Sequence, residues 1–154
     1  MSLNKSTDLK ELKKFDIDLQ FGQQWEKYID DLLNGSSKIE VKTEKDIWAN
    51  TGNLAMEYQY KGHDSGLKVT ESDIWIENFV KDGEIYFSML FPTDKLKEVC
   101  NFVTPRLTNG GDNNDSKLAL YKIKAIIDGM IELANNKKVK CTHCNRNDYT
   151  CGCR

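Results

Sequence analysis

The sequence predicts an α+β domain over residues 1–136, followed by a small cysteine-rich module over residues 137–154. Near the N-terminus apolar residues repeat at the helix period, and several later stretches alternate apolar and polar residues as strands do. Four of the five cysteines fall within the last 14 residues. A chain of 154 residues can build one domain with a real core and an appendage, but not two full domains.

The first predicted elements are one helix and two strands. Apolar residues from Phe21 to Leu33 recur at spacings of three and four, so we predict a helix over 18–33 that stops at Asn34-Gly35 and follows a loose lead-in over 1–14. Residues 37–44 and 54–61 each alternate with period two. Because a short turn-rich stretch separates these two strands, we predict that they pair as an antiparallel hairpin.

The second half predicts two further strands and two helices. Asp82-Gly83 is a strong hairpin turn, and it lies between predicted strands 73–80 and 84–91. Thr93 is a candidate cap for a helix that ends before Pro105. We expect a surface loop over 109–115 and a long helix over 116–135, capped by Ser116.

Composition indicates a soluble globular protein without a membrane partner. Hydrophobic residues make up 39% and charged residues 30% of the chain, and no apolar run approaches the ~20 residues of a membrane span. The polar N-terminus does not resemble a signal peptide, so we predict a cytoplasmic location. The net charge of −2 excludes a strongly basic nucleic-acid binder, and any affinity for DNA must come from local patches.

Two acidic residues and a lysine form the candidate catalytic constellation. Alternation places Glu40 and Lys42 on one side of the first strand, and Glu57 and Gln59 on one side of the second. One or two carboxylates beside a phosphate can hold Mg²⁺, and a nearby lysine can stabilise a phosphoryl transition state. The competing interpretation is that this alternation marks an ordinary solvent-facing strand.

Several ordered motifs resemble phage-type members of the PD-(D/E)xK nuclease superfamily. The resemblance covers roughly residues 18–120 and implies a restriction-endonuclease-like core, in which helices flank a mixed central sheet. It also implies cleavage of nucleic acid with Mg²⁺ or Mn²⁺, with DNA as the expected substrate, in phage or mobile-element DNA metabolism. For a phage-encoded chain it implies the host cytoplasm. The matching segments are Phe21 to Glu26, Ile39 to Glu44, Thr51 to Glu57, Ser65-Gly66-Leu67 with Thr70 and Asp73, and Asn109 to Ser116.

The resemblance assigns catalytic residues in two alternative registers. In the first, Glu40-Val41-Lys42 is the Glu-x-Lys signature, although no Pro-Asp precedes it. In the second, which we prefer, Glu40 is the first-strand acid and Glu57-Tyr58-Gln59 is the signature, with Gln59 in the place of the lysine and Lys42 beside it. Glu40 and Glu57 are then the magnesium ligands. Glu26 matches the acid of the family's first helix, and the alternative is that it is a helix-boundary residue.

The C-terminal cysteines predict a structural zinc site. Cys141 and Cys144 form one pair and Cys151 and Cys153 form another, and four thiolates complete a tetrahedral zinc shell. His143 could replace one of them, and a loose tail of thiols is the alternative. Basic residues around the module could contact phosphate, or zinc could simply fasten the chain end.

The sequence therefore supports three hypotheses. The first is a Mg²⁺-dependent endonuclease that acts on DNA, for which a homodimer is one candidate assembly. The second is a non-catalytic nucleic-acid-binding or assembly module that keeps the nuclease-like fold and the zinc. The third is a zinc-stapled interaction domain whose acidic strand face is plain surface; it predicts that Glu40 and Glu57 lie far apart.

Overall fold

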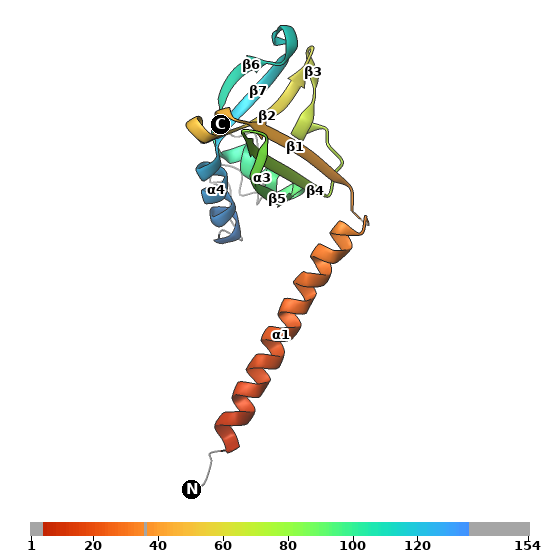
Figure 1. Ribbon diagram of the computed structural model, residues 1–154, viewed down its shortest axis with the longest axis vertical. Coiled ribbons are helices and arrows are strands. Elements are labelled where there is room, and N and C mark those ends of the chain that lie inside the picture. The colour runs from red at the N-terminus through yellow and green to blue at the C-terminus, as the bar shows by residue number, and fades with distance from the viewer. Residues whose placement is uncertain (1–4, 36, 136–154) are drawn as a thin grey trace, which may run out of the picture. The chain divides into compact units, whose positions relative to one another are not determined.

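A computed structural model describes residues 5–35 and 37–135, which divide into two units at Ser37/Lys38. The first unit contains helix α1, and the second contains every other described helix and strand (Figure 1). Within these described residues, no helix is both long enough and apolar enough to cross a membrane.

Helix α1 is longer than the sequence predicted, because it runs over Lys5–Leu33. The expected loose lead-in is therefore wrong for residues 5–14, which are helical. The aromatic rings of Phe21, Trp25 and Tyr28 follow one another edge to face, with centroids 5.9 and 6.0 Å apart. Lys27 and Asp31 form an ion pair of 2.7 Å one turn apart, which adds local support to the exposed surface of the helix.

The second unit contains two sheets. The first has the strand order β1-β4-β5, in which β1 (Ile39–Lys45) lies parallel to β4 (Ile74–Lys81), and β4 lies antiparallel to β5 (Glu84–Pro92). The second sheet is antiparallel and has the order β3-β2-β7-β6. Its strands are β2 (Asn53–Tyr60), β3 (His63–Asp64), β6 (Arg106–Gly110) and β7 (Ser116–Lys122).

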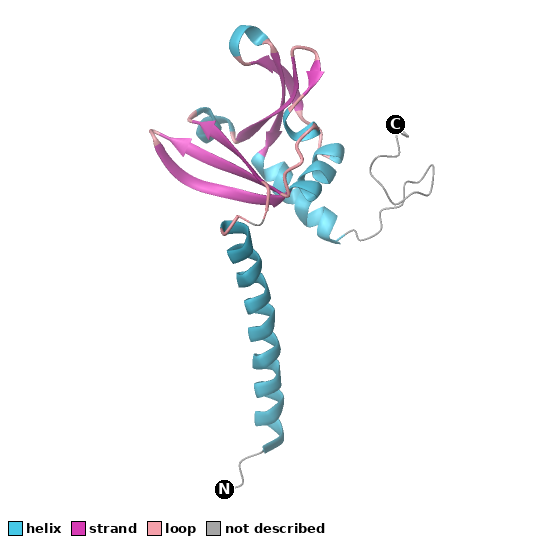
Figure 2. Cartoon of the chain, turned by 90° about the vertical axis from the view of Figure 1, so that its right-hand side faces the viewer, coloured by secondary structure: helices cyan, strands magenta, loops and turns pink. Residues whose placement is uncertain are grey.

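Short and long helices connect and cover these strands (Figure 2). Helices α3 and α4 lie side by side, and the close approach occurs at Gly129, where a Cβ would stand 2.7 Å from Val99 Cγ1. The buried core includes Leu54 and Met56 of β2, Trp75 and Phe79 of β4, and residues of both helices. The helices are α2 (Ile47–Thr51), α3 (Thr93–Phe102), α4 (Ile123–Asn135) and the 3₁₀ turns η1 (Gly66–Lys68) and η2 (Asp112–Asn114).

The predicted hairpin between the first two strands is wrong. The chain turns through α2 after β1, and backbone bonds tie both ends of β1 to β4: Ile74 N donates to Lys38 O, and Asp46 N donates to Val80 O. The Trp48 indole adds a bond of 2.7 Å to the same Val80 carbonyl. Strand β2 instead pairs with β7, where its buried residues Leu54 and Met56 lie opposite Tyr121 and Ala119.

The long helix predicted over 116–135 is wrong in its first third, where residues 116–122 form β7. The predicted loop likewise overlaps β6. Apolar residues occupy both faces of β7, since Leu118 and Leu120 alternate with Ala119 and Tyr121, and such a run imitates a helical stripe. The prediction of α3 is confirmed, although the Thr93 hydroxyl contacts Ser72 Oγ and does not cap the helix.

Candidate active site

The parallel pairing of β1 with β4 brings the predicted Glu40 and Lys42 beside two buried residues. Glu40 lies opposite Trp75, and Lys42 lies opposite Glu77. The Lys42 ammonium forms an ion pair of 2.7 Å with Glu40 Oε1, and it lies 5.5 Å from the centre of the Trp75 ring. One face of this sheet therefore carries the Glu40–Lys42 ion pair, and the buried ring of Trp75 lies beneath the ammonium.

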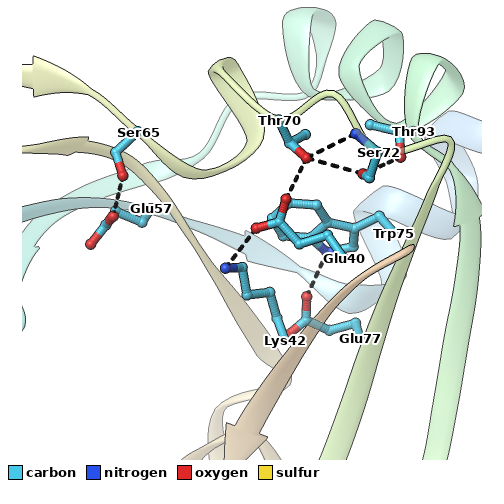
Figure 3. A network of polar contacts seen from close by, with 9 residues as sticks. All are labelled: Glu40, Lys42, Glu57, Ser65, Thr70, Ser72, Trp75, Glu77 and Thr93. Carbon is cyan, nitrogen blue, oxygen red and sulfur yellow. Dashed lines mark hydrogen bonds and ion pairs between the residues drawn. The ribbon is translucent and has the colours of Figure 1, made fainter. Parts of the chain in front are cut away.

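Hydroxyl groups hold the second oxygen of the Glu40 carboxylate. The Thr70 hydroxyl donates to Glu40 Oε2, and it is linked to Ser72 Oγ at 3.0 Å (Figure 3). Lys97 Nζ, from α3, donates to the Thr70 carbonyl at 2.8 Å. Burial raises the pKa of Glu40, but the bonds from Lys42 and Thr70 and the charges of Lys42 and Lys97 outweigh it, so the net pKa is lowered. Glu40 is thus held as a carboxylate.

Glu57 is held in the same way from the other sheet. Ser116 Oγ donates to its Oε2 at 2.5 Å, and Ser65 Oγ donates to its Oε1. The bonds from Ser116 and Ser65, followed by the positive charge of Lys42, lower the pKa of Glu57 despite partial burial. Both oxygens of this carboxylate are therefore oriented.

Two glycines permit these serine contacts. Gly66 has φ +57°, and a Cβ at this position would stand 2.1 Å from the Glu57 carbonyl oxygen. Gly111 has φ +71°, and a Cβ there would stand 2.9 Å from Ser116 Oγ. Because glycine adopts these conformations without strain, the chain at Gly66 approaches Glu57, and the chain at Gly111 approaches Ser116, more closely than a residue with a Cβ would allow.

The Lys42 ammonium joins the two halves of the cluster. Its charge lowers the pKa of Glu57 as well as that of Glu40, although the two glutamates come from different sheets. Figure 3 shows this ammonium between the two carboxylates, with Glu77 on the neighbouring strand. Lys42 therefore forms an ion pair with Glu40, and its charge also acts on Glu57 although the predicted hairpin is absent.

Glu77 is a buried carboxyl that the sequence analysis did not single out. It is 1% exposed, and its Oε2 accepts a hydrogen bond of 2.9 Å from the Trp75 indole. Its Oε1 is buried and has no hydrogen-bond partner. Burial raises the pKa of Glu77 to about 7; the Trp75 bond and the Lys42 charge partly oppose this, and the Glu44 charge adds to it.

The Gln59 side chain bonds to a turn rather than to Glu40, Lys42 or Glu57. Gln59 follows a register shift in β2, and its amide donates to the Gly62 carbonyl at 3.1 Å. Glu26 lies on α1, in the other unit. The four zinc-site cysteines, Cys141, Cys144, Cys151 and Cys153, lie outside the described residues. Cys100 packs its sulfur 3.6 Å from Met56, and burial raises the pKa of this thiol to about 12, so it is an inert core residue as predicted.

A pocket of about 790 Å³ lies beside the cluster. Ala55, two residues before Glu57, is in its wall, and so is Leu118, which pairs with Glu57 across β2 and β7. Glu44 also lines it, and its Oε1 accepts a bond of 2.5 Å from the Ala55 amide. Lys45 and Arg106 supply positive charge at this pocket, and threonines and an asparagine supply neutral polar groups.

The described part of the chain contains no group of three or more histidine, cysteine, aspartate or glutamate side chains arranged to hold a metal ion. The donor set of the cluster is nevertheless of the kind that Mg²⁺ uses. Mg²⁺ favours hard oxygen ligands and commonly takes only one or two carboxylates, with water and substrate phosphate as the others. Glu40 and Glu57 carry oxygens of this kind, and the charge of Lys42 lowers the pKa of both carboxyl groups.

Comparisons with known proteins add no identification. No family model matches the chain, and neither a curated protein nor a solved structure matches it. The case for a function therefore depends on the residues of the chain itself.

Most residues missed by the sequence analysis as site residues lie within the segments that carried the resemblance. Ser65, Thr70 and Ser116 were quoted there only as parts of motifs, and in the structure each one donates to Glu40 or Glu57. Their presence in these segments was the available signal. Glu77 gave a weaker signal. It is the one acidic residue in the run Ile74 to Val80, in which every other residue except Asn78 is apolar.

Proposed function

We propose that this chain is a magnesium-dependent nuclease of the PD-(D/E)xK type that hydrolyses phosphodiester bonds of DNA, as an endonuclease. The observation that carries the proposal is the position of the Lys42 ammonium, which forms an ion pair with Glu40 on β1 and whose charge also lowers the pKa of Glu57 on β2. Acidic surface strands do not require such convergence. The plain-surface hypothesis expected the two glutamates to be unrelated in space, and their shared interaction with Lys42 argues against it.

Glu40 and Glu57 are the residues that would hold Mg²⁺. Their carboxyl groups have lowered pKa values, so both are ionised at neutral pH without a metal. Hydroxyl donors orient them, which limits the reorganisation needed for binding. Bound there, the ion would lower the pKa of a water molecule and offset negative charge on the phosphate.

Lys42 supplies the second part of the chemistry. Its ammonium lies 2.7 Å from Glu40, so it is within reach of a phosphate that is bound at the same carboxylate. A fixed positive charge at this point stabilises the extra negative charge of the phosphoryl transition state. The pocket beside the cluster, with Lys45 and Arg106 in its wall, offers phosphate contacts to the flanking nucleotides.

The decisive experiment is a cleavage assay with branched, duplex and single-stranded DNA in Mg²⁺ or Mn²⁺. Glu40→Gln and Lys42→Met should each lower cleavage by at least about 100-fold, because each removes a group that acts in the transition state. Glu84→Gln, at the exposed start of β5, is the matched control for loss of one negative charge and should cut normally. Equal cleavage by the Glu40 variant and the control would contradict the proposal.

A non-catalytic nucleic-acid-binding module is the second candidate. It is favoured by Gln59, which stands where the preferred register expects a lysine and bonds to the turn at Gly62. This alternative predicts metal-independent DNA binding and no cleavage with any divalent cation. Gel-shift and cleavage assays on the same protein sample separate the two candidates.

We further propose that the tail binds one structural Zn²⁺ through Cys141, Cys144, Cys151 and Cys153. The support is the sequence spacing alone, with two close pairs of thiolates. The basic residues around these cysteines would give the tail affinity for phosphate.

A further inference from the structure

Glu77 stands apart from the other acids of the cluster because half of its carboxyl group lacks a partner. Its Oε2 accepts the Trp75 indole hydrogen, whereas its Oε1 is buried without a hydrogen bond. An orphaned buried oxygen costs free energy. Such a group in a native protein calls for an explanation, such as strain, a catalytic role, or a water molecule or ion that satisfies it.

Lys42 can supply the missing partner. The two residues lie opposite each other on neighbouring strands, and the Lys42 charge acts on the Glu77 carboxyl. The Lys42 ammonium also lies over the ring of Trp75, whose indole is bonded to Glu77 (Figure 3). In the present state this ammonium is bonded to Glu40 instead.

A divalent cation on Glu40 would compete directly with that ion pair, because both need the same carboxylate. Resting on the function proposed above, we propose that Glu77 is the positioning residue for Lys42 in the metal-bound state. The ammonium leaves Glu40 for the vacant Oε1 of Glu77 when the cation binds. Lys42 then remains beside the phosphate of the substrate. Its negatively charged partner becomes Glu77 in place of Glu40.

The exchange makes Glu77 important for cation binding only through Lys42. Replacing the carboxyl with an amide keeps the shape of the side chain and an acceptor for Trp75, but it removes the charge that draws Lys42 away from Glu40. Supporting residues of this kind commonly change metal affinity by 10- to 100-fold. We therefore expect Glu77→Gln to weaken Mg²⁺ binding by about 10-fold.

A double-mutant cycle measures this dependence. Mg²⁺ alone is titrated calorimetrically into the full-length wild type, Glu77→Gln, Lys42→Met and the double variant, with Glu84→Gln as the charge control. The loss caused by Glu77→Gln should disappear in the Lys42→Met background, because no ammonium then competes for Glu40. An equal loss in both backgrounds would show that Glu77 acts on the cation or the fold directly, and it would overturn the inference.

The Trp75 indole provides a second measurement that needs no substitution at Glu77. Its N–H resonance, assigned with Trp75→Phe, should move when Mg²⁺ binds the wild-type protein, because the accepting carboxyl gains a charged partner. Saturable Mg²⁺ binding that leaves this resonance unmoved would overturn the inference and leave the nuclease proposal standing. A wild-type protein that neither binds Mg²⁺ nor cleaves DNA would overturn both.

Discussion

The protonation of single residues determines how this cluster responds to pH. Glu40 and Glu57 have lowered pKa values because hydroxyl and ammonium donors favour their charged forms. Glu77 has a raised pKa because burial favours its neutral form. The pKa values of the three glutamates around Lys42 are therefore shifted in opposite directions. Acid–base and metal-binding sites require such a separation of pKa values.

The raised pKa of Glu77 predicts that Glu77→Gln stabilises the protein at alkaline pH. With a pKa of about 7 in the folded state and an ordinary value of 4.5, the stability contributed by the neutral carboxyl is complete below pH 4.5 and is lost as pH rises through 7. The ionised form costs about 3 kcal/mol at pH 8. Urea unfolding in magnesium-free buffer should show the variant gaining on the wild type between pH 5 and 8. A constant difference across this range would contradict the assignment.

The lowered pKa of Glu57 predicts that Ser116→Ala makes the stability of the protein less sensitive to acid pH. Removing the largest of the lowering contributions should move the pKa of Glu57 up toward its ordinary value. The stability that this carboxylate provides is present above pH 4.5 and is lost as pH falls, so the variant should be less pH-sensitive in acid. Carboxyl carbon NMR measures the pKa directly. Ser88→Ala, which removes a surface hydroxyl bonded to Asn78, should leave it unchanged.

At the scale of elements, the site depends on two hydroxyl groups that reach Glu57 of β2. Ser65 directly precedes η1 and Ser116 begins β7, and a glycine stands close to each contact. The acids lie within strands, which give a rigid base, while the donors lie next to turns. This division is common in binding sites built on sheets.

The close contact of Gly66 with β2 predicts that Gly66→Ala disrupts the site. An added Cβ would overlap the Glu57 carbonyl oxygen, and the positive φ adds strain, so we expect a loss of about 2 kcal/mol or more in the free energy of unfolding. Cleavage should fall with it because Glu57 is displaced. Gly62→Ala is the matched control, since Gly62 has φ +84° but no atom within 4 Å of its added Cβ. Equal losses in the two variants would show that the contact with Glu57 is unimportant.

The sequence predicted local features of this fold better than its strand pairing. The strands around Glu40 and Glu57 were recognisable from alternation, the strand around Glu77 from its largely apolar run, and helix α3 from its boundaries. The parallel pairing of β1 with β4 was not recognisable from the sequence. It depends on α2, which turns the chain away, and on hydrogen bonds between residues more than 30 positions apart. Lys42 and Glu40 were predicted correctly as neighbours, since two residues on one strand face need no knowledge of topology.

At the scale of the whole molecule, the near-neutral charge requires positive charge to be concentrated locally. The chain has 22 basic and 24 acidic residues, and several of the acids surround Lys42. A DNA-binding protein with this balance must place basic groups where the phosphates run. The wall of the pocket offers Lys45 and Arg106, and the C-terminal sequence offers a basic segment around its cysteines.

The cysteine spacing predicts one zinc ion per chain, bound independently of the magnesium site. Mass spectrometry of metal content should give a 1:1 ratio for the wild type and for Glu40→Gln, because carboxylates and thiolates select different ions. Cys144→Ser and Cys151→Ser, one from each pair, should each lose the zinc, whereas His143→Ala should keep it because four thiolates complete the shell. If the zinc module also contacts phosphate, Cys144→Ser will bind DNA more weakly and with a shallower salt dependence. Unchanged DNA affinity after zinc loss would assign the module to chain-end stabilisation alone, and retention of zinc by both cysteine variants would refute the site.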